Sequence, residues 1–216
     1  MYIVFEGIVG TGKTTHSKKL AEYLKKKYPE KKIVWTREPG GTDISQKIRE
    51  IAQGTKYASE MDPICEIYLY AASRAQSLRK VVKPELIKNN IVVADRSYIT
   101  ALVNQGIGKN LGIDRVMSIN KEAVGNITPD LIIFLDYGVR RSLKRTFDKE
   151  KDKWENFGED FYRLTREGYL KVSKMKDFKD KWITVRMKDC LIEENFSNIV
   201  GKAEKRIDRI IRNQQR

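Results

Sequence analysis

The sequence is poor in cysteine and histidine and has no long apolar run. Its two cysteines, Cys65 and Cys190, lie far apart and form no CxxC pair, which argues against a disulfide-rich scaffold and a zinc site of paired cysteines. The single histidine, His16, has no second histidine with which to share a metal, and we expect it to be a structural helix residue. No stretch of roughly 18 apolar residues and no signal-like start occurs. These absences favour a soluble, cytoplasmic protein.

Positive charge is in excess. The chain has 43 Lys and Arg against 29 Asp and Glu, a formal net charge of +14, which suits a polyanionic substrate or partner. The cations are nevertheless scattered along the chain between acids, and no basic stripe alternates with stacking aromatic residues. We therefore expect a solvated surface with a nucleotide phosphate site, and no nucleic acid partner.

Five short apolar segments have the character of buried parallel strands. They lie at 2–6, 33–37, 91–95, 131–135 and 182–186. Longer segments between them have the spacing of amphipathic helices, and this alternation predicts an α/β fold. The expected architecture is a three-layer α/β/α sandwich around a five-stranded parallel sheet. A length of 216 residues fits one domain, which we place at 1–216.

The predicted helices are marked by apolar residues three and four positions apart. These stripes lie on Ser17, Leu20, Ala21, Leu24 and Tyr28, on Ile64, Ile67, Tyr68, Ala71, Ala75 and Leu78, on Phe161, Leu164, Gly168, Val172 and Met175, and on Val200, Ala203, Ile207 and Ile210. Residues 147–156 are instead dense in charge and carry almost no core-forming side chain. We expect an exposed, mobile flap there.

A glycine-rich motif directly follows the first predicted strand. Residues 7–14, GIVGTGKT, satisfy the pattern G-x-x-x-x-G-K-[ST] and open the first predicted helix. The glycines let successive backbone N–H groups point at phosphate oxygens, and the helix N-terminus adds partial positive charge. We expect Lys13 to reach the β- and γ-phosphates of ATP and Thr14 to ligate Mg²⁺. The predicted ATP-binding residues are Gly7, Ile8, Val9, Gly10, Thr11, Gly12, Lys13, Thr14 and Thr15.

Polar residues end the second and third predicted strands, at the edge where an open α/β sheet binds ligands. The second strand runs into TREPGGT, in which Arg37 can fork onto a phosphate. The third ends in Asp95, a Walker-B-like carboxylate and the second predicted Mg²⁺ ligand, and Arg96 follows it. Two arginines at one edge predict a pocket for an acceptor that already bears a phosphate. The alternative is that PGG is only a turn.

A polar stripe lies on the second predicted helical segment. Glu66, Tyr70 and Arg74 are four residues apart and therefore share one face of the helix. A ring and a guanidinium on one face can stack on a base and bond to its edge. The alternative is a packed tyrosine beside a surface arginine.

Together these motifs resemble the thymidylate kinase family in order and spacing over about residues 2–175. The matching pieces are FEGxxGTGKTT, TREPGGT, YAASRAQ with a later KP, DR after the third strand, QG at 105–106, PDLIIFLD, and LKR at 143–145. REPGG combined with AASRAQ is far more specific than the phosphate loop, which many unrelated proteins share. The resemblance implies a P-loop kinase fold and an enzyme that transfers the γ-phosphoryl group of ATP, with Mg²⁺, to dTMP.

The resemblance also implies roles for individual residues. Arg37 and Arg96 would face the phosphate of thymidylate, Arg74 its base, and Tyr70 would stack on thymine. The family is generally homodimeric and takes its LID from the segment after LKR, here about residues 145–156, where Arg145 is the best-placed arginine. The acceptor-binding residues would be Arg37, Glu38, Tyr70, Arg74, Arg96, Thr100 and Gln105, and the catalytic residues Lys13, Asp95, Arg96 and Arg145.

Several positions depart from the family pattern. Val9 stands where these enzymes usually carry an Asp or Glu that holds the deoxyribose 3′-hydroxyl, and an isopropyl group cannot accept that bond. Ser97 replaces the common aromatic after DR, and Asn104 replaces a tyrosine that helps to exclude a 2′-hydroxyl. Lys149 and Lys153 replace LID arginines, so slower turnover is expected because lysine lacks the bidentate fork.

Two other functions therefore remain open from the sequence. A related kinase could act on another pyrimidine monophosphate, such as dUMP or dCMP. A non-catalytic nucleotide-binding protein could instead dock nucleic acid through the basic face of the last helix, which carries Lys202, Lys205, Arg206, Arg209 and Arg212.

Overall fold

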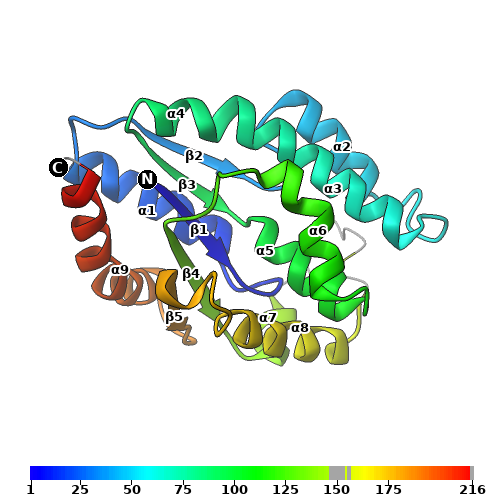
Figure 1. The fold of residues 1–216 in the computed structure, drawn as a ribbon. Coiled ribbons are helices and arrows are strands. Elements are labelled where there is room, and N and C mark those ends of the chain that lie inside the picture. Colours follow the sequence, from blue (N-terminus) through cyan, green and yellow to red (C-terminus); the bar gives the residue numbers. More distant parts are fainter. Residues whose placement is uncertain (146–153, 155–156, 215–216) are drawn as a thin grey trace.

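A five-stranded parallel sheet forms the centre of the molecule (Figure 1). The computed structural model describes residues 1–145, 154 and 157–214. The strands are β1 (Tyr2–Glu6), β2 (Ile33–Arg37), β3 (Ile91–Asp95), β4 (Leu131–Asp136) and β5 (Trp182–Arg186), in the order β2-β3-β1-β4-β5. All five predicted strands are confirmed, and β4 is one residue longer than expected.

Helices connect each strand to the next. The α-helices are α1 (Lys13–Lys27), α2 (Asp43–Gln53), α3 (Pro63–Ser77), α4 (Lys83–Ile87), α5 (Tyr98–Ala101), α6 (Ile113–Val124), α7 (Val139–Lys144), α8 (Glu159–Val172) and α9 (Ile192–Gln214). Two π-helices, η1 (Leu78–Val82) and η2 (Leu102–Gly108), continue α3 and α5, and a short 3₁₀ turn, η3 (Lys179–Lys181), precedes β5. Every connection between paired strands is thus a helical crossover, as parallel pairing requires.

The sheet is covered on both faces, which explains why its strands are apolar throughout. Alternate side chains of β1, such as Tyr2 and Val4, pack with α3, α5, α6 and α8. Their neighbours Ile3 and Phe5 pack with α1 and α9 on the opposite face. The three-layer α/β/α prediction is confirmed. The assignment of 1–216 to a single domain stays a prediction.

Two of the predicted helix stripes are wrong in part. In α8 the buried residues are Tyr162, Thr165, Gly168, Tyr169 and Val172, whereas Leu164 is 43% exposed. In α3, Tyr68 is 59% exposed. In both helices the inward face is occupied by polar or amphipathic side chains, whose hydroxyl or carboxylate groups are buried in hydrogen bonds. Leu164 and Tyr68 therefore face outward.

The predicted flap lies largely outside the described residues, and the LID boundaries of 145–156 therefore stay a prediction. Trp154, the one residue of 147–156 that is described, is only 8% exposed, so the expectation of an exposed stretch is wrong for this side chain. None of the helices in the described part of the chain is long and apolar enough to span a bilayer.

Candidate functional site

The phosphate loop connects β1 to α1 in a conformation that requires glycine. Gly10 has a φ of +71°, and a Cβ there would lie 2.0 Å from the carbonyl oxygen of Ser142. Gly12, the residue before α1, has a φ of +85°. Only glycine enters this region without strain. The loop therefore curls back on itself at the N-terminus of α1, where backbone N–H groups and the helix dipole can receive phosphate.

Lys13 is buried beneath this loop. Its Nζ donates to the carbonyl oxygen of Ile8 at 2.6 Å and lies 3.4 Å from Oγ1 of Thr11. Burial, and secondarily the positive charge of Arg96, lower the pKa of Lys13 to about 7. The loop thus holds the ammonium group in a place where a polyphosphate could become its counterion.

Thr14 and Asp95 form a pair of oxygen donors at the end of β3. The hydroxyl of Thr14 donates to Oδ2 of Asp95, and Oδ1 of this buried carboxylate has no hydrogen-bond partner among the described residues. A hydroxyl and a carboxylate with a free oxygen fit a hydrated Mg²⁺ ion, which prefers such ligands and keeps several waters.

Arg96 directly follows β3 and has a φ of +75°, an uncommon conformation for a residue other than glycine. Its backbone N–H donates to Phe5 at 2.9 Å. Its Nη1 lies 3.1 Å from the carbonyl oxygen of Gly7 and 3.2 Å from Oγ1 of Thr100. The guanidinium is therefore placed beside the phosphate loop, next to Asp95.

Glu6 is a buried carboxylate directly before the phosphate loop, and the sequence did not reveal its role. Its fully buried carboxylate accepts from the backbone N–H of Ser97 at 2.8 Å, from Oγ of Ser97 at 2.7 Å and from Oγ1 of Thr100 at 2.6 Å. The hydroxyl of Tyr169 adds a bond of 3.1 Å. Burial raises the pKa of Glu6, and these donors oppose the rise. The sequence feature that could have indicated this role is a carboxylate at the end of an apolar strand, directly before the phosphate loop.

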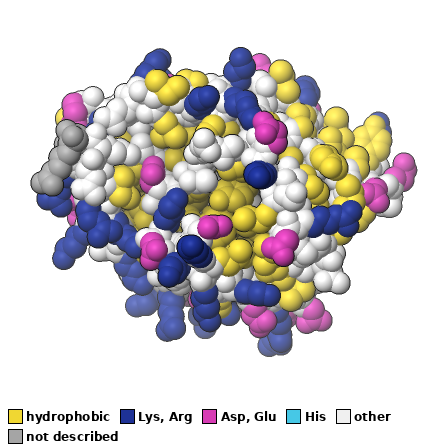
Figure 2. Space-filling model, in the orientation of Figure 1, with side chains coloured by type: hydrophobic (Ala, Val, Ile, Leu, Met, Phe, Trp, Pro, Cys, Tyr) yellow, Lys and Arg dark blue, Asp and Glu magenta, His cyan; other side chains and the backbone are white. Residues whose placement is uncertain are grey.

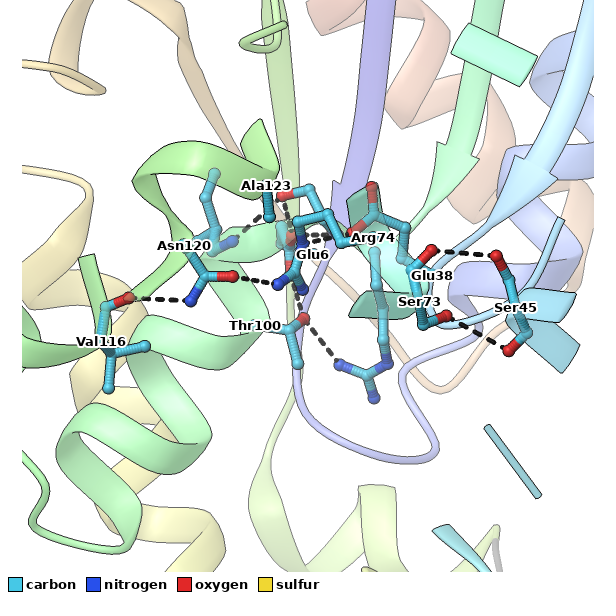
Figure 3. A network of polar contacts seen from close by, with 12 residues as sticks. Glu6, Glu38, Ser45, Ser73, Arg74, Thr100, Val116, Asn120 and Ala123 are labelled. Atoms are coloured by element: carbon cyan, nitrogen blue, oxygen red, sulfur yellow. Dashed lines mark hydrogen bonds and ion pairs between the residues drawn. The ribbon is translucent and has the colours of Figure 1, made fainter. Parts of the chain in front are cut away.

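The predicted stripe on α3 points into the structure. Arg74 donates from Nε to Oε2 of Glu38 at 2.7 Å and from Nη1 to Oδ1 of Asn120 (Figure 3). Both members of the Arg74–Glu38 pair are buried, so the alternative of a surface arginine is wrong. Glu38 thus acts as the counterion of Arg74. Ser45 and Ser73, also drawn in Figure 3, exchange two hydrogen bonds that join α2 to α3.

One cavity of about 530 Å³ brings most of the predicted residues together. Of these it is lined by Ile8, Val9, Gly10, Gly12, Lys13, Thr14, Thr15, Arg37, Glu38, Tyr70, Arg74, Asp95, Arg96, Thr100, Gln105 and Arg145. Gly7 and Thr11 shape the loop without lining the cavity. Nε of Arg37 and Oε1 of Gln105 have no hydrogen-bond partner among the described residues. Both atoms are therefore available to a ligand.

The cavity is also lined by residues for which the sequence predicted no ligand-binding role. His16 lies in α1 and stacks on Phe196 with ring centroids 6.5 Å apart, as a structural residue would, yet it also lines the cavity. Burial lowers the pKa of His16 to about 4. Trp154, Tyr162 and Cys190 line the cavity as well. Their positions depend on tertiary contacts that no local sequence motif predicts.

Arg145 lies at one end of the cavity and is held by side chains outside it. Its Nη2 is 3.5 Å from Oδ1 of Asp189, and its Cζ is 4.5 Å from the ring centroid of Tyr137. Arg141 pairs with the same carboxylate at 3.2 Å, and Arg140 pairs with Glu159. Lys149 and Lys153 lie outside the described residues. The catalytic role expected of Arg145 stays a prediction.

The comparisons with known proteins agree with one another. The family model described as Thymidylate kinase matches residues 5–199. A thymidylate kinase of Mycoplasma mobile is 39% identical over 215 residues, covering 98% of this chain and 100% of that protein. A thymidylate kinase of Thermosipho africanus is 39% identical and covers 82% and 86%.

A solved structure gives the same result. The crystal structure of thymidylate kinase from Ehrlichia chaffeensis superposes with a TM-score of 0.73 at 27% identity, covering 93% of this chain and 96% of that one. The order of the motifs, the parallel sheet and these similarities all agree, and the chain belongs to the thymidylate kinase family.

Proposed function

We propose that this chain transfers the γ-phosphoryl group of ATP to dTMP, giving dTDP and ADP for dTTP synthesis. The observation that carries the proposal is the single cavity shared by Lys13 of the phosphate loop and by Arg37, Arg74 and Arg96. A donor bound at the loop and an acceptor phosphate bound at the arginines would then face each other. Such positioning supplies much of the catalysis in phosphoryl transfer, because little covalent chemistry is required.

The residues would divide the work as follows. Lys13 binds the β- and γ-phosphates, and Arg37 and Arg96 hold the acceptor phosphate so that its oxygen attacks the γ-phosphorus as the bond to ADP breaks. Thr14 and Asp95 would hold Mg²⁺, which offsets the charge on the phosphates. Arg145 is the candidate LID cation. Tyr70 and Gln105 would receive the base, by stacking and by accepting its N–H at Oε1.

The test is ADP release from ATP and Mg²⁺ in the presence of dTMP, dUMP, dCMP, TMP, UMP or AMP. We expect dTMP to give the highest turnover and removal of Mg²⁺ to abolish it. A response to none of the six nucleotides would contradict the proposed activity. A higher turnover with dUMP or dCMP would retain the reaction and change the acceptor. The ribonucleotides TMP and UMP in the same panel test the sugar selectivity that Val9 and Asn104 leave open, since both residues line the cavity without a carboxylate or a phenol.

The pKa of Lys13 predicts a pH dependence for ATP binding. The amine has a pKa of about 7 in the free protein, and bound phosphates favour its charged form, so they raise this pKa. Raising the pH above 7 then depletes the form that binds, and the dissociation constant of ATP should rise by up to about tenfold per pH unit.

Calorimetry at about pH 8.5 in two buffers of different ionisation enthalpy should detect proton uptake on ATP binding. The control is Lys13→Arg, because arginine stays charged over this range. Its ATP affinity should be nearly independent of pH. An equally steep pH dependence in this variant would show that another group titrates.

We also propose a cytoplasmic homodimer. Exposed apolar side chains lie on α2, where Ile44 and Ile51 are found, and on α3, where Tyr68 is found. Such residues suit a subunit interface. Light scattering should give twice the mass of one chain.

Surface charge gives little support to the nucleic acid alternative. In α9, Lys202 donates to Thr184, and Arg206 donates to Trp182 and Asp180. These two cations therefore bind backbone carbonyl oxygens of β5 and of η3, which precedes it. Figure 2 shows Lys and Arg crowded along the lower edge of one face, with Asp and Glu among them.

A further inference from the structure

Glu66, the first residue of the polar stripe on α3, has no part in the proposed chemistry although it is only 1% exposed. Its Oε1 accepts from Nε2 of Gln105 at 3.0 Å, and its Oε2 pairs with Nζ of Lys109 at 2.7 Å. A buried carboxylate with two donors fixes the groups around it. Glu66 therefore ties α3 to the π-helix η2 and to Lys109 immediately after it.

Trp154 packs on this arrangement. The ammonium group of Lys109 lies 5.0 Å from the ring centroid of Trp154, within range for a cation–π contact. Nε1 of Trp154 donates to the hydroxyl of Tyr70 at 2.8 Å. The ring of Phe157 stacks on the indole, with ring centroids 5.4 Å apart. The indole is thus held by bonds and ring contacts from several directions.

We propose that Trp154 is the outer wall of the acceptor-base pocket and limits the acceptor to a single-ring base. This inference rests on the proposed function. Trp154 lines the same cavity as Tyr70, Asn104 and Gln105, the residues that would contact the base. Its contact with Tyr70 places the indole beside the ring on which the base would stack, with centroids 6.3 Å apart.

The size of the side chain explains the selectivity. The indole packs beside Tyr70, so it would occupy the space that the second ring of a purine needs when the first ring stacks on Tyr70. Polar groups keep the wall in place, because Tyr70 offers the hydroxyl that accepts from Nε1 and Lys109 covers the ring face. Removal of the indole should leave space for the second ring of a purine.

The test compares Trp154→Ala with wild type, using dTMP and dGMP as acceptors. We expect the ratio of kcat/KM for dTMP to that for dGMP to fall by about tenfold or more, a usual range for discrimination by pocket shape. The KM for dTMP should rise while the KM for ATP stays unchanged, because the wall lies on the acceptor side. Trp154→Phe retains an aromatic wall and should keep most of the selectivity.

Trp35→Ala is the matched control. Trp35 is a partly buried tryptophan on β2 whose Nε1 donates to Ser17 at 2.9 Å, and it does not line the cavity. Its replacement should lower the melting temperature without changing the acceptor ratio. If Trp154→Ala does not fold, Trp154→Leu and calorimetric binding of dTMP and dGMP provide the same comparison.

The outcomes separate the two proposals. An unchanged acceptor ratio in a folded Trp154→Ala protein, or an equal rise in the KM values of ATP and dTMP, overturns the inference and leaves the kinase assignment intact. If wild type releases no ADP with any acceptor and binds no dTMP, the proposed function itself fails.

Discussion

Lys13→Ala is expected to lower kcat by about 100-fold or more, a loss of at least about 2.7 kcal/mol of transition-state stabilisation. The lysine is the one buried ammonium group at the phosphate loop among the described residues, with Nζ 2.6 Å from the carbonyl oxygen of Ile8. Charge spreads over the transferred phosphoryl group as it leaves ADP, and a cation in a desolvated site stabilises that charge strongly.

Steady-state ADP release with saturating ATP and dTMP measures this loss. Lys25→Ala is the matched control, since it makes the same substitution in α1 at an exposed residue paired with Glu22. It should turn over like wild type. Circular dichroism should show that Lys13→Ala remains folded, because the lost ammonium group bonded only to the loop. Near-normal turnover by this variant would remove Lys13 from the mechanism.

The second large effect is on stability. Arg74→Ala should lower the free energy of unfolding by about 3–5 kcal/mol, the usual loss when one partner of a buried ion pair is removed. Glu38 would be left buried without its counterion, and Oδ1 of Asn120 would lose a donor. Acceptor affinity should fall as well, because Arg74 lines the cavity.

Urea unfolding at two pH values tests the cause of this loss. Burial raises the pKa of Glu38 already in the wild type, where Arg74 opposes the rise. In the variant burial acts without that opposition, so Glu38 is protonated more readily, and the loss of stability should shrink as the pH falls. Adding Glu38→Gln to the Arg74→Ala variant should recover part of the lost stability.

Lys47→Ala, which breaks an exposed pair with Glu50, should change stability far less than Arg74→Ala. An equal loss from both variants, or a loss from Arg74→Ala that is independent of pH, would contradict this account.

The parts of the fold that could be predicted are those encoded by local pattern. The strands are short apolar runs because both faces of the sheet are covered, and the phosphate loop is a fixed sequence motif. The inward face of α8 was predicted incorrectly because Tyr162 and Tyr169 are buried there together with their hydroxyl groups, while Leu164 faces solvent. Hydrophobicity alone does not indicate which residues of α8 face the core.

The parts of the site that could not be predicted depend on contacts between distant segments. Glu6 is bonded to residues more than 90 positions away, and Trp154 is bonded to Tyr70 across 84. The family motifs named Arg74 and Glu38 separately, but nothing in their spacing indicates that one neutralises the other. Such pairings arise only when the tertiary fold brings distant segments of the chain together.

The contact between Gly10 and Ser142 has a consequence for how substitutions can accumulate in this enzyme. The hydroxyl of Ser142 donates to the carbonyl oxygen of Val9, and the backbone of α7 occupies the space where a side chain at position 10 would lie. Val9 lines the cavity, so a carboxylate could be introduced at position 9 by a single substitution, whereas position 10 admits no residue larger than glycine unless α7 moves as well. Two neighbouring positions of the loop therefore differ in whether a larger side chain can be accepted without movement of a helix.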